Sequence, residues 1–120
     1  MGEEISWHVE LSVKPGQLDN FRTLTGEMVA VTRREPGVLS YQRFVSEDGA
    51  TVHVYERYSD SGAAVAHLDA FAKCFAGRFS AMVDRKVFTV FGDPSAKLKA
   101  ALDRFDAVYL KPFGDWEYWA

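Results

Sequence analysis

The most constraining feature of the chain is a strict alternation of apolar and polar side chains over residues 5–13, ISWHVELSV. Successive side chains of a β-strand point to opposite sides, so a period of two predicts a strand with one buried and one exposed face. The apolar positions are Ile5, Trp7, Val9, Leu11 and Val13. The rest of the sequence therefore has to supply both partner strands and a cover for one face of a sheet.

Residues 17–34 supply the first cover, because their apolar side chains recur at about 100° per residue, the period of an amphipathic helix. Glu35-Pro36-Gly37 ends this helix. Two segments rich in β-branched and aromatic residues follow, 38–46 and 51–58. The loop between them contains Asp48-Gly49, which predicts a β-hairpin.

A second helix is expected to begin at Ser59-Asp60-Ser61, whose side chains are good N-caps, and to run to about Met82 with a break near Gly77. A fourth strand is expected over residues 86–91. Gly92-Asp93-Pro94-Ser95 then starts a short helix, and an extended, aromatic-rich tail ends the chain.

This βαββαβ order predicts an α+β fold of the ferredoxin-like kind, an antiparallel four-stranded sheet with two helices on one face. We treat residues 1–120 as one domain, with a core over 5–92 and a C-terminal extension, helix plus tail, over 93–120. The other sheet face is left bare. Because the strands after the first carry apolar side chains on both sides, we expect that face to be covered in a homodimer; a monomer in light scattering would count against this.

Charge and hydropathy exclude several classes of protein. The chain has 14 Lys and Arg against 17 Asp and Glu, a formal net charge of −3, and lacks the basic surplus of a nucleic-acid-binding protein. No segment approaches the roughly 20 apolar residues of a membrane span. Gly2 with Ser6 matches a myristoylation pattern, but the pattern is too short and common to support lipidation. Cys74 is the single cysteine, which is typical of a cytoplasmic protein.

An ordered set of short motifs resembles the antibiotic-biosynthesis-monooxygenase-like domains. The motifs are Val13-Lys14-Pro15-Gly16-Gln17, Glu35-Pro36-Gly37 with Leu39 and Tyr41, Asp48-Gly49, and Glu56 with Tyr58-Ser59-Asp60 and His67. The resemblance implies a small dimeric α+β barrel of the quinol monooxygenase type. It also implies oxygenation of an electron-rich aromatic, such as a hydroquinone or an anthrone, by O₂ without a metal or flavin cofactor.

Such chemistry needs a base, and two residues are candidates for the catalytic role. His67 titrates near neutral pH and lies at the edge of the apolar stripe of the second helix, where the family pattern has a histidine. Glu56 lies on an apolar strand face, where a carboxylate must be paired or have a raised pKa. Structural roles are the alternatives: a hydrogen bond from His67 to a loop carbonyl, and an ion pair between Glu56 and Arg43.

Substrate contacts are expected from aromatic side chains. Tyr41 and Tyr58 are candidate donors to a substrate oxygen, and Phe71 and Phe75 are candidate walls of an aromatic pocket, although all four residues could also serve as ordinary packing. A metal site has little support, because the three histidines fall on three separate elements with no close pair.

Two alternative functions remain open at this point. One is a dimeric domain that binds a small ligand, or acts in a stress response, without turnover. The other is a haem-degrading oxygenase of the same fold, which the chain resembles less well because residues 5–13 lack the asparagine that such enzymes carry on the first strand.

Overall fold

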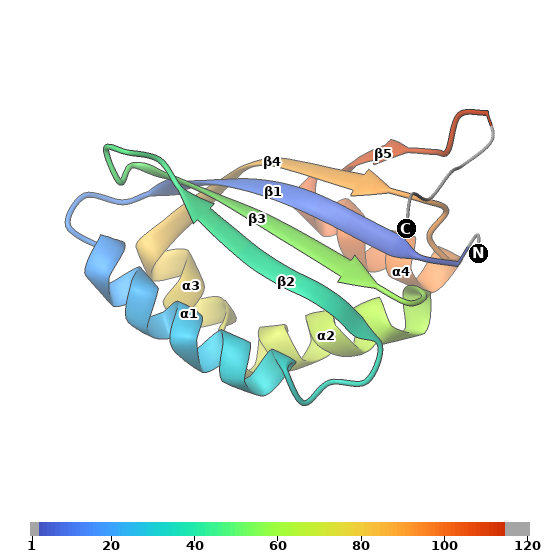
Figure 1. The fold of residues 1–120 in the computed structure, drawn as a ribbon, viewed down its shortest axis with the longest axis horizontal. Helices are drawn as coiled ribbons and strands as arrows, with labels where there is room; N and C mark the ends of the chain where they lie inside the picture. Colours follow the sequence, from blue (N-terminus) through green and yellow to red (C-terminus); the bar gives the residue numbers. More distant parts are fainter. Residues whose placement is uncertain (1–2, 115–120) are drawn as a thin grey trace, which may run out of the picture.

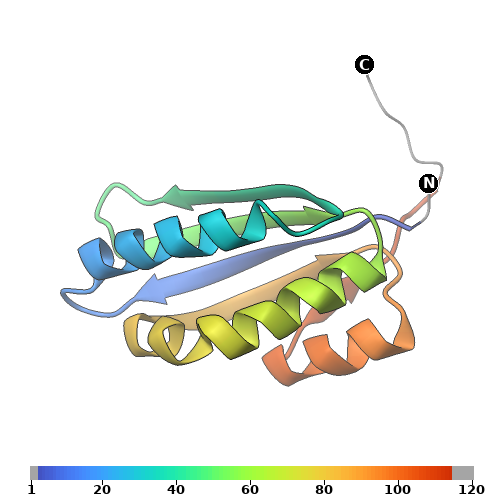
Figure 2. The ribbon, with the colours of Figure 1, turned by 90° about the horizontal axis from the view of Figure 1, so that it is seen from below.

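A five-stranded sheet forms one layer of the computed structural model, and helices form the other (Figures 1 and 2). The structure describes residues 3–114. The elements are β1 (Ile5–Val13), α1 (Leu18–Thr32), β2 (Val38–Val45), β3 (Thr51–Tyr58), α2 (Ser61–Cys74), α3 (Ala76–Met82), β4 (Val83–Phe91), α4 (Ala96–Leu102), a 3₁₀ turn η1 (Asp103–Phe105) and β5 (Val108–Leu110). The predicted α+β, ferredoxin-like fold is confirmed. In the described range no helix has the length and apolarity needed to cross a bilayer.

The sheet has the strand order β2-β3-β1-β4-β5, with β1 at its centre. The prediction of four antiparallel strands was incomplete. Val108–Leu110, expected as part of an extended tail, pairs with β4 in parallel and makes the sheet mixed. The crossover through α4 and η1 returns the chain to the same edge of the sheet in the β4 direction, as a β-helix-β unit does. Residues 115–119 of the expected aromatic tail, and Gly2, lie outside the described residues.

Two other boundaries differ from the prediction. β4 begins at Val83 rather than at residue 86, because a bulge opposite Glu10 and Leu11 shifts the register and interrupts the alternation of apolar residues. The second helical segment breaks at Phe75, close to the predicted position, and restarts as α3. The predicted N-cap is present: the Asp60 carboxylate accepts a hydrogen bond of 2.9 Å from the backbone N–H of Ala63.

Strand register lines up the side chains that point toward the helices in three rows across β2, β3, β1 and β4. The first inward row is Tyr41–Glu56–Trp7–Val90, the second is Arg43–Val54–Val9–Phe88, and the third is Val45–Val52–Leu11–Arg85. Most of these side chains are buried apolar groups, as the alternation in β1 predicts. The polar members stand at inward positions and are therefore enclosed between sheet and helices.

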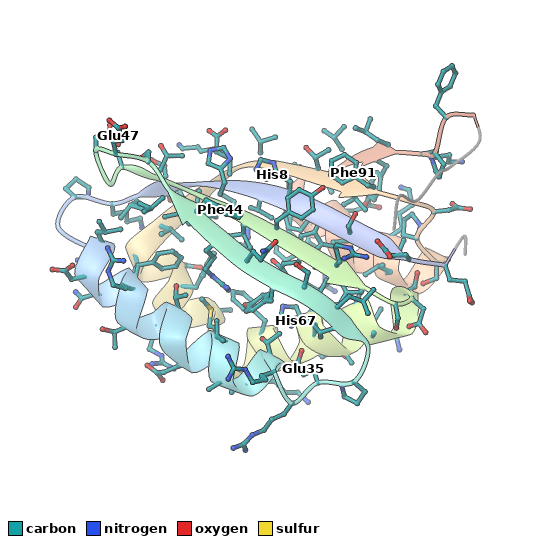
Figure 3. The ribbon with its side chains drawn as sticks, viewed as in Figure 1. His8, Glu35, Phe44, Glu47, His67 and Phe91 are labelled. Atoms are coloured by element: carbon teal, nitrogen blue, oxygen red, sulfur yellow. The ribbon has the colours of Figure 1, made fainter. Side chains whose placement is uncertain are left out.

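The opposite face of the sheet is not covered by any element of the described chain, as predicted (Figures 1 and 3). His8 and Phe44 lie on this open face, and several large apolar side chains there are strongly exposed. They are Phe44, Tyr55, Val87, Val108 and Leu110, with 40–58% of their surface accessible. The open face is therefore apolar in the way that favours a partner.

The turn between α1 and β2 is held tightly against the start of α2. Gly37 has φ +83°, in the left-handed region, and a Cβ atom there would lie 2.6 Å from the Ala63 Cβ and 2.8 Å from the Ser59 Oγ. The Gly37 carbonyl also accepts a hydrogen bond of 2.8 Å from the Ser59 N–H. Only glycine fits both the backbone angle and the close approach.

We expect Gly37→Ala to lower the free energy of unfolding by about 2–5 kcal/mol, from left-handed strain plus overpacking against α2. Gly16→Ala is the matched control, because Gly16 has φ +76° but a Cβ added there would have no atom within 4 Å. That variant should lose only about 1–2 kcal/mol, the strain alone. Urea denaturation measures both, and equal losses would show that the approach of the turn to α2 is not tight.

Candidate active site

His67 lies between two carboxylates in the interior of the protein. It projects from α2 toward the sheet, and only 5% of its surface is exposed. Its Nδ1 is 2.8 Å from Glu35 Oε1 and its Nε2 is 3.3 Å from Glu56 Oε1. Figure 3 shows Glu35 beside His67, on the segment that follows α1. We call these three side chains the carboxylate–imidazole triad.

Glu56 is the member of the triad on the sheet. It stands in the first inward row, between Tyr41 and Trp7, and is 8% exposed. The Tyr58 hydroxyl donates a short hydrogen bond to Glu56 Oε1, and the Trp7 side chain also hydrogen-bonds the carboxylate. A buried carboxylate is therefore supplied with the donors that its charged form requires.

Mutual attraction keeps both groups of the Glu56–His67 pair charged. Burial alone lowers the pKa of His67, but hydrogen bonds and charge from Glu56 and Glu35 outweigh it, and the net shift is upward. Burial alone raises the pKa of Glu56, but the hydrogen bond and charge of His67, with the Tyr58 and Trp7 donors, produce a net downward shift. The arrangement thus favours the charged forms, an imidazolium beside carboxylates.

Tyr41 and Arg43 extend the polar region along β2. The Tyr41 ring meets the His67 ring edge-on at 5.3 Å, and burial together with the charge of Glu56 raises the pKa of Tyr41 to about 12. Its hydroxyl therefore keeps its proton at physiological pH. The Arg43 guanidinium lies over the Tyr41 ring, 3.9 Å from the ring centre, and its Nε is buried without a hydrogen-bond partner among the described residues.

A cavity lies between the sheet and the helices, with the triad at one end. Its free volume is about 40 Å³, and it lies within a wider indentation of about 450 Å³ that includes open solvent. The polar wall includes Tyr41, Arg43, Glu56, His67 and Arg85, and the remaining wall is apolar: Trp7, Val9, Leu11, Met28, Val54, Leu68, Phe71, Phe79, Phe88 and Phe105. A mostly apolar hollow with a few polar groups is typical of a site for a small organic molecule.

The cavity wall contains four of the six residues that the sequence indicated: His67, Glu56, Tyr41 and Phe71. The two others, Tyr58 and Phe75, are not part of the wall. Tyr58 is fully buried and its hydroxyl is bonded to Glu56. Phe75 lies at the break between α2 and α3, where φ of −130° turns its side chain away from the direction that a continuous helix would give.

The sequence left structural roles open for the two candidate bases, and the partners that His67 and Glu56 have in the structure differ from the ones expected. His67 is bonded to the side chain of Glu35 rather than to a loop carbonyl. Glu56 is paired with His67 and Tyr58, and among the ion pairs of residues 3–114 none joins it to Arg43. In the same part of the chain, no three His, Cys, Asp or Glu side chains converge in an arrangement that would hold a metal ion.

Sequence reasoning missed three residues of the site. The sequence places Glu35 in a helix stop and in a motif of the family resemblance, but neither pattern indicates that its carboxylate meets His67. Arg85 was missed because β4 was expected to begin after it; it is the charged residue at an inward position of β4. Phe105 comes from the extension, and its place against Phe88, with ring centres 5.4 Å apart, requires the fold of η1.

Residues 5–76, well over half of the chain, match the family model described as antibiotic biosynthesis monooxygenase. The chain belongs to this family. The resemblance stated from its sequence motifs is thereby confirmed. No curated protein sequence matches this antibiotic biosynthesis monooxygenase family member.

Solved structures similar to this family member show the same fold. MupZ from Pseudomonas fluorescens is 19% identical, with a TM-score of 0.85, over 97% of this chain and 95% of that one. SO0527 from Shewanella oneidensis is 25% identical, with a TM-score of 0.62, over 75% and 88%. SnoaB from Streptomyces nogalater, a cofactor-independent oxygenase, is 16% identical, with a TM-score of 0.66, over 78% and 96%.

The buried Glu56–His67 pair makes the free energy of unfolding decrease at both high and low pH. The folded pKa of His67 is above its unfolded value of 6.5, so its contribution is complete below pH 6.5 and is lost as the pH rises through the folded pKa. The folded pKa of Glu56 is below its unfolded value of 4.5, so its contribution is complete above pH 4.5 and is lost as the pH falls through the folded pKa.

We therefore expect Glu56→Gln to lower the maximum free energy of unfolding by about 3 kcal/mol and to remove most of the acid-side decline, while Glu35 retains part of the alkaline one. Urea unfolding from about pH 2 to pH 9 measures the profile, because the Glu56 contribution is lost only below pH 4.5. Glu27→Gln is the control, because Glu27 pairs with Arg78 on the surface at 3.0 Å and should lose less than about 1 kcal/mol. Identical profiles for the two variants would contradict the assignment.

Proposed function

We propose that this protein is a cofactor-independent monooxygenase that oxidises an electron-rich aromatic, a hydroquinone-like or anthrone-like molecule, with O₂. The observation that carries the proposal is the carboxylate–imidazole triad at the wall of an aromatic-lined cavity. Family membership supports a monooxygenase-like role, and the similar fold of SnoaB, itself a cofactor-independent oxygenase, agrees with it.

The triad suits the removal of a proton from the substrate. Two carboxylates and one imidazolium carry a combined charge of −1, so the group as a whole accepts one proton and becomes neutral. Glu56 is the carboxylate that lines the cavity and receives this proton, while Glu35 keeps the imidazolium compensated from behind. His67 thus acts with Glu56 as one proton-accepting unit rather than as an isolated base.

Deprotonation is the step that makes the aromatic reactive toward oxygen. The substrate anion donates electrons to O₂, and the resulting peroxide at the ring carbon collapses to a carbonyl. For an anthrone-like CH₂ group, the carbon loses two hydrogens and gains one oxygen atom, while the second oxygen atom leaves as water. The four electrons come from the substrate, so the balance needs no further reductant.

Tyr41 and the apolar wall support the intermediates. The Tyr41 hydroxyl remains protonated and lies in the same inward row as Glu56, where it donates to the developing oxyanion. Phe71, Phe79 and Phe88 exclude water from the anion and the peroxide.

We also propose that the protein functions as a homodimer built on the open face. Phe44 and Val108 are 58% and 52% exposed there, and a large exposed apolar patch of this kind marks an interaction site. Two copies packed sheet to sheet would bury the exposed apolar side chains of both open faces. This is the arrangement expected from the sequence.

Activity tests the triad directly. With a panel of hydroquinones and anthrones in an oxygen electrode, we expect His67→Ala and Glu56→Gln to reduce oxygen uptake by about 10²–10⁴-fold, the usual contribution of general acid–base catalysis. Glu27→Gln makes the same chemical change at an exposed position of α1 and should retain the wild-type rate. Equal background rates for wild type and His67→Ala would reject catalysis and leave a ligand-binding domain.

Light scattering tests the dimer. Wild type should elute with a mass of about 27 kDa, twice the 13.5 kDa of the chain, and Phe44→Arg should shift it toward 13.5 kDa by placing an uncompensated charge on the apolar face. Val31→Arg is the matched control, since Val31 is 38% exposed on α1, away from the open face. A wild-type monomer at micromolar concentration would refute the proposal.

A further inference from the structure

Arg85 is a cation enclosed by aromatic rings at the cavity wall. Its guanidinium carbon is 4.5 Å from the centre of the Phe105 ring, 4.7 Å from that of Phe79 and 5.7 Å from that of Phe71. These rings come from η1, α3 and α2, and Arg85 itself from β4. Four separate elements therefore fix the guanidinium in one place.

In the part of the chain that the structure describes, no anionic group contacts the Arg85 guanidinium. Among residues 3–114 its guanidinium makes no hydrogen bond and no ion pair, and its surroundings are apolar enough for burial to lower the pKa of the group. The charge of Glu56 acts in the opposite direction and raises the pKa of Arg85, but no ion pair joins the two side chains among residues 3–114. A partly desolvated cation with free donors is costly unless something anionic pairs with it, and the donors face a cavity.

Arg85 and Glu56 stand at opposite ends of that cavity. Glu56 is in the first inward row on β3 and Arg85 is in the third inward row on β4, so two strand spacings and four residues separate them. With usual strand dimensions their backbones are roughly 16 Å apart. No ion pair joins the two side chains among residues 3–114, so we place an anion at Arg85 on a second group of the ligand, remote from the proton that Glu56 accepts.

We propose that the substrate carries a carboxylate, bound by Arg85, at the opposite end of its aromatic system from the hydroxyl or activated carbon that meets the triad. This inference rests on the proposed function for the triad end and adds the substrate class. A carboxylate fits better than a simple point anion, because the planar guanidinium presents paired donors to two oxygen atoms while its faces stay against Phe79 and Phe105.

A matched pair of fluorescent probes tests this: 6-hydroxy-2-naphthoate and 6-hydroxy-2-naphthamide, which share ring, length and hydroxyl and differ in charge. Calorimetry and probe fluorescence, measured without oxygen, give both affinities. We expect wild type to bind the naphthoate about 10- to 100-fold more tightly than the naphthamide, the range for a charge-assisted hydrogen bond. Because no turnover is involved, this result is independent of whether the protein consumes oxygen.

Variants locate the effect. Arg85→Gln should reduce naphthoate affinity by the same 10- to 100-fold while the naphthamide affinity stays within about twofold, which also shows that the cavity is intact; Arg85→Lys should restore part of the difference. Arg78→Gln, an arginine on the surface paired with Glu27, should bind both probes like wild type. Equal affinities of wild type for the two probes, no naphthoate binding at millimolar concentration, or an unchanged preference in Arg85→Gln would overturn the proposal.

Discussion

The rest of the site depends on one arrangement, an imidazole buried between two carboxylates. Burying His67 alone would neutralise it, and burying Glu56 alone would raise its pKa; each keeps the other charged. The arrangement also ties the fold together, because Glu35 follows α1, Glu56 is on β3 and His67 is on α2. The Gly37 turn brings the first of these against the third, so the tight approach of that loop to α2 and the charge of the triad are parts of the same structure.

In the proposed site, the triad end of the cavity accepts the substrate proton and the Arg85 end binds the substrate carboxylate. A strongly paired carboxylate is a weak base when considered alone, since a lowered pKa means a weaker hold on a proton. The triad compensates through its net charge of −1, and the cationic side chains Arg43 and Arg85 stand elsewhere on the wall. Proton uptake and anion binding are thereby separated in space. A site that placed Arg85 in contact with Glu56 would neutralise both, and it would do neither task.

The sequence predicted the elements of the core well because their signals are local. Period-two alternation in residues 5–13, the Asp48-Gly49 hairpin and the Asp60 N-cap each depend on neighbouring residues only. The site was predicted in part. His67 and Glu56 were found because a titratable group on an apolar face is unusual, whereas Glu35 and Arg85 were missed because their roles arise from which distant elements pack together. β5 was missed for the same reason: three residues become a strand only because β4 offers an unpaired edge.

The C-terminal extension is part of the cavity rather than an appendage to it. Phe105 stacks on Phe88 with ring planes 5° apart and covers the Arg85 guanidinium, and α4, held to the start of α2 by the Ser95 N–H to Ser61 Oγ hydrogen bond, buries Leu98 and Leu102 completely. The similarity to MupZ runs over 97% of the chain, which must include most of residues 93–120, whereas that to SnoaB covers 78%. In this chain the core over residues 5–92 carries the triad, and Phe105 of the extension encloses the Arg85 end of the cavity.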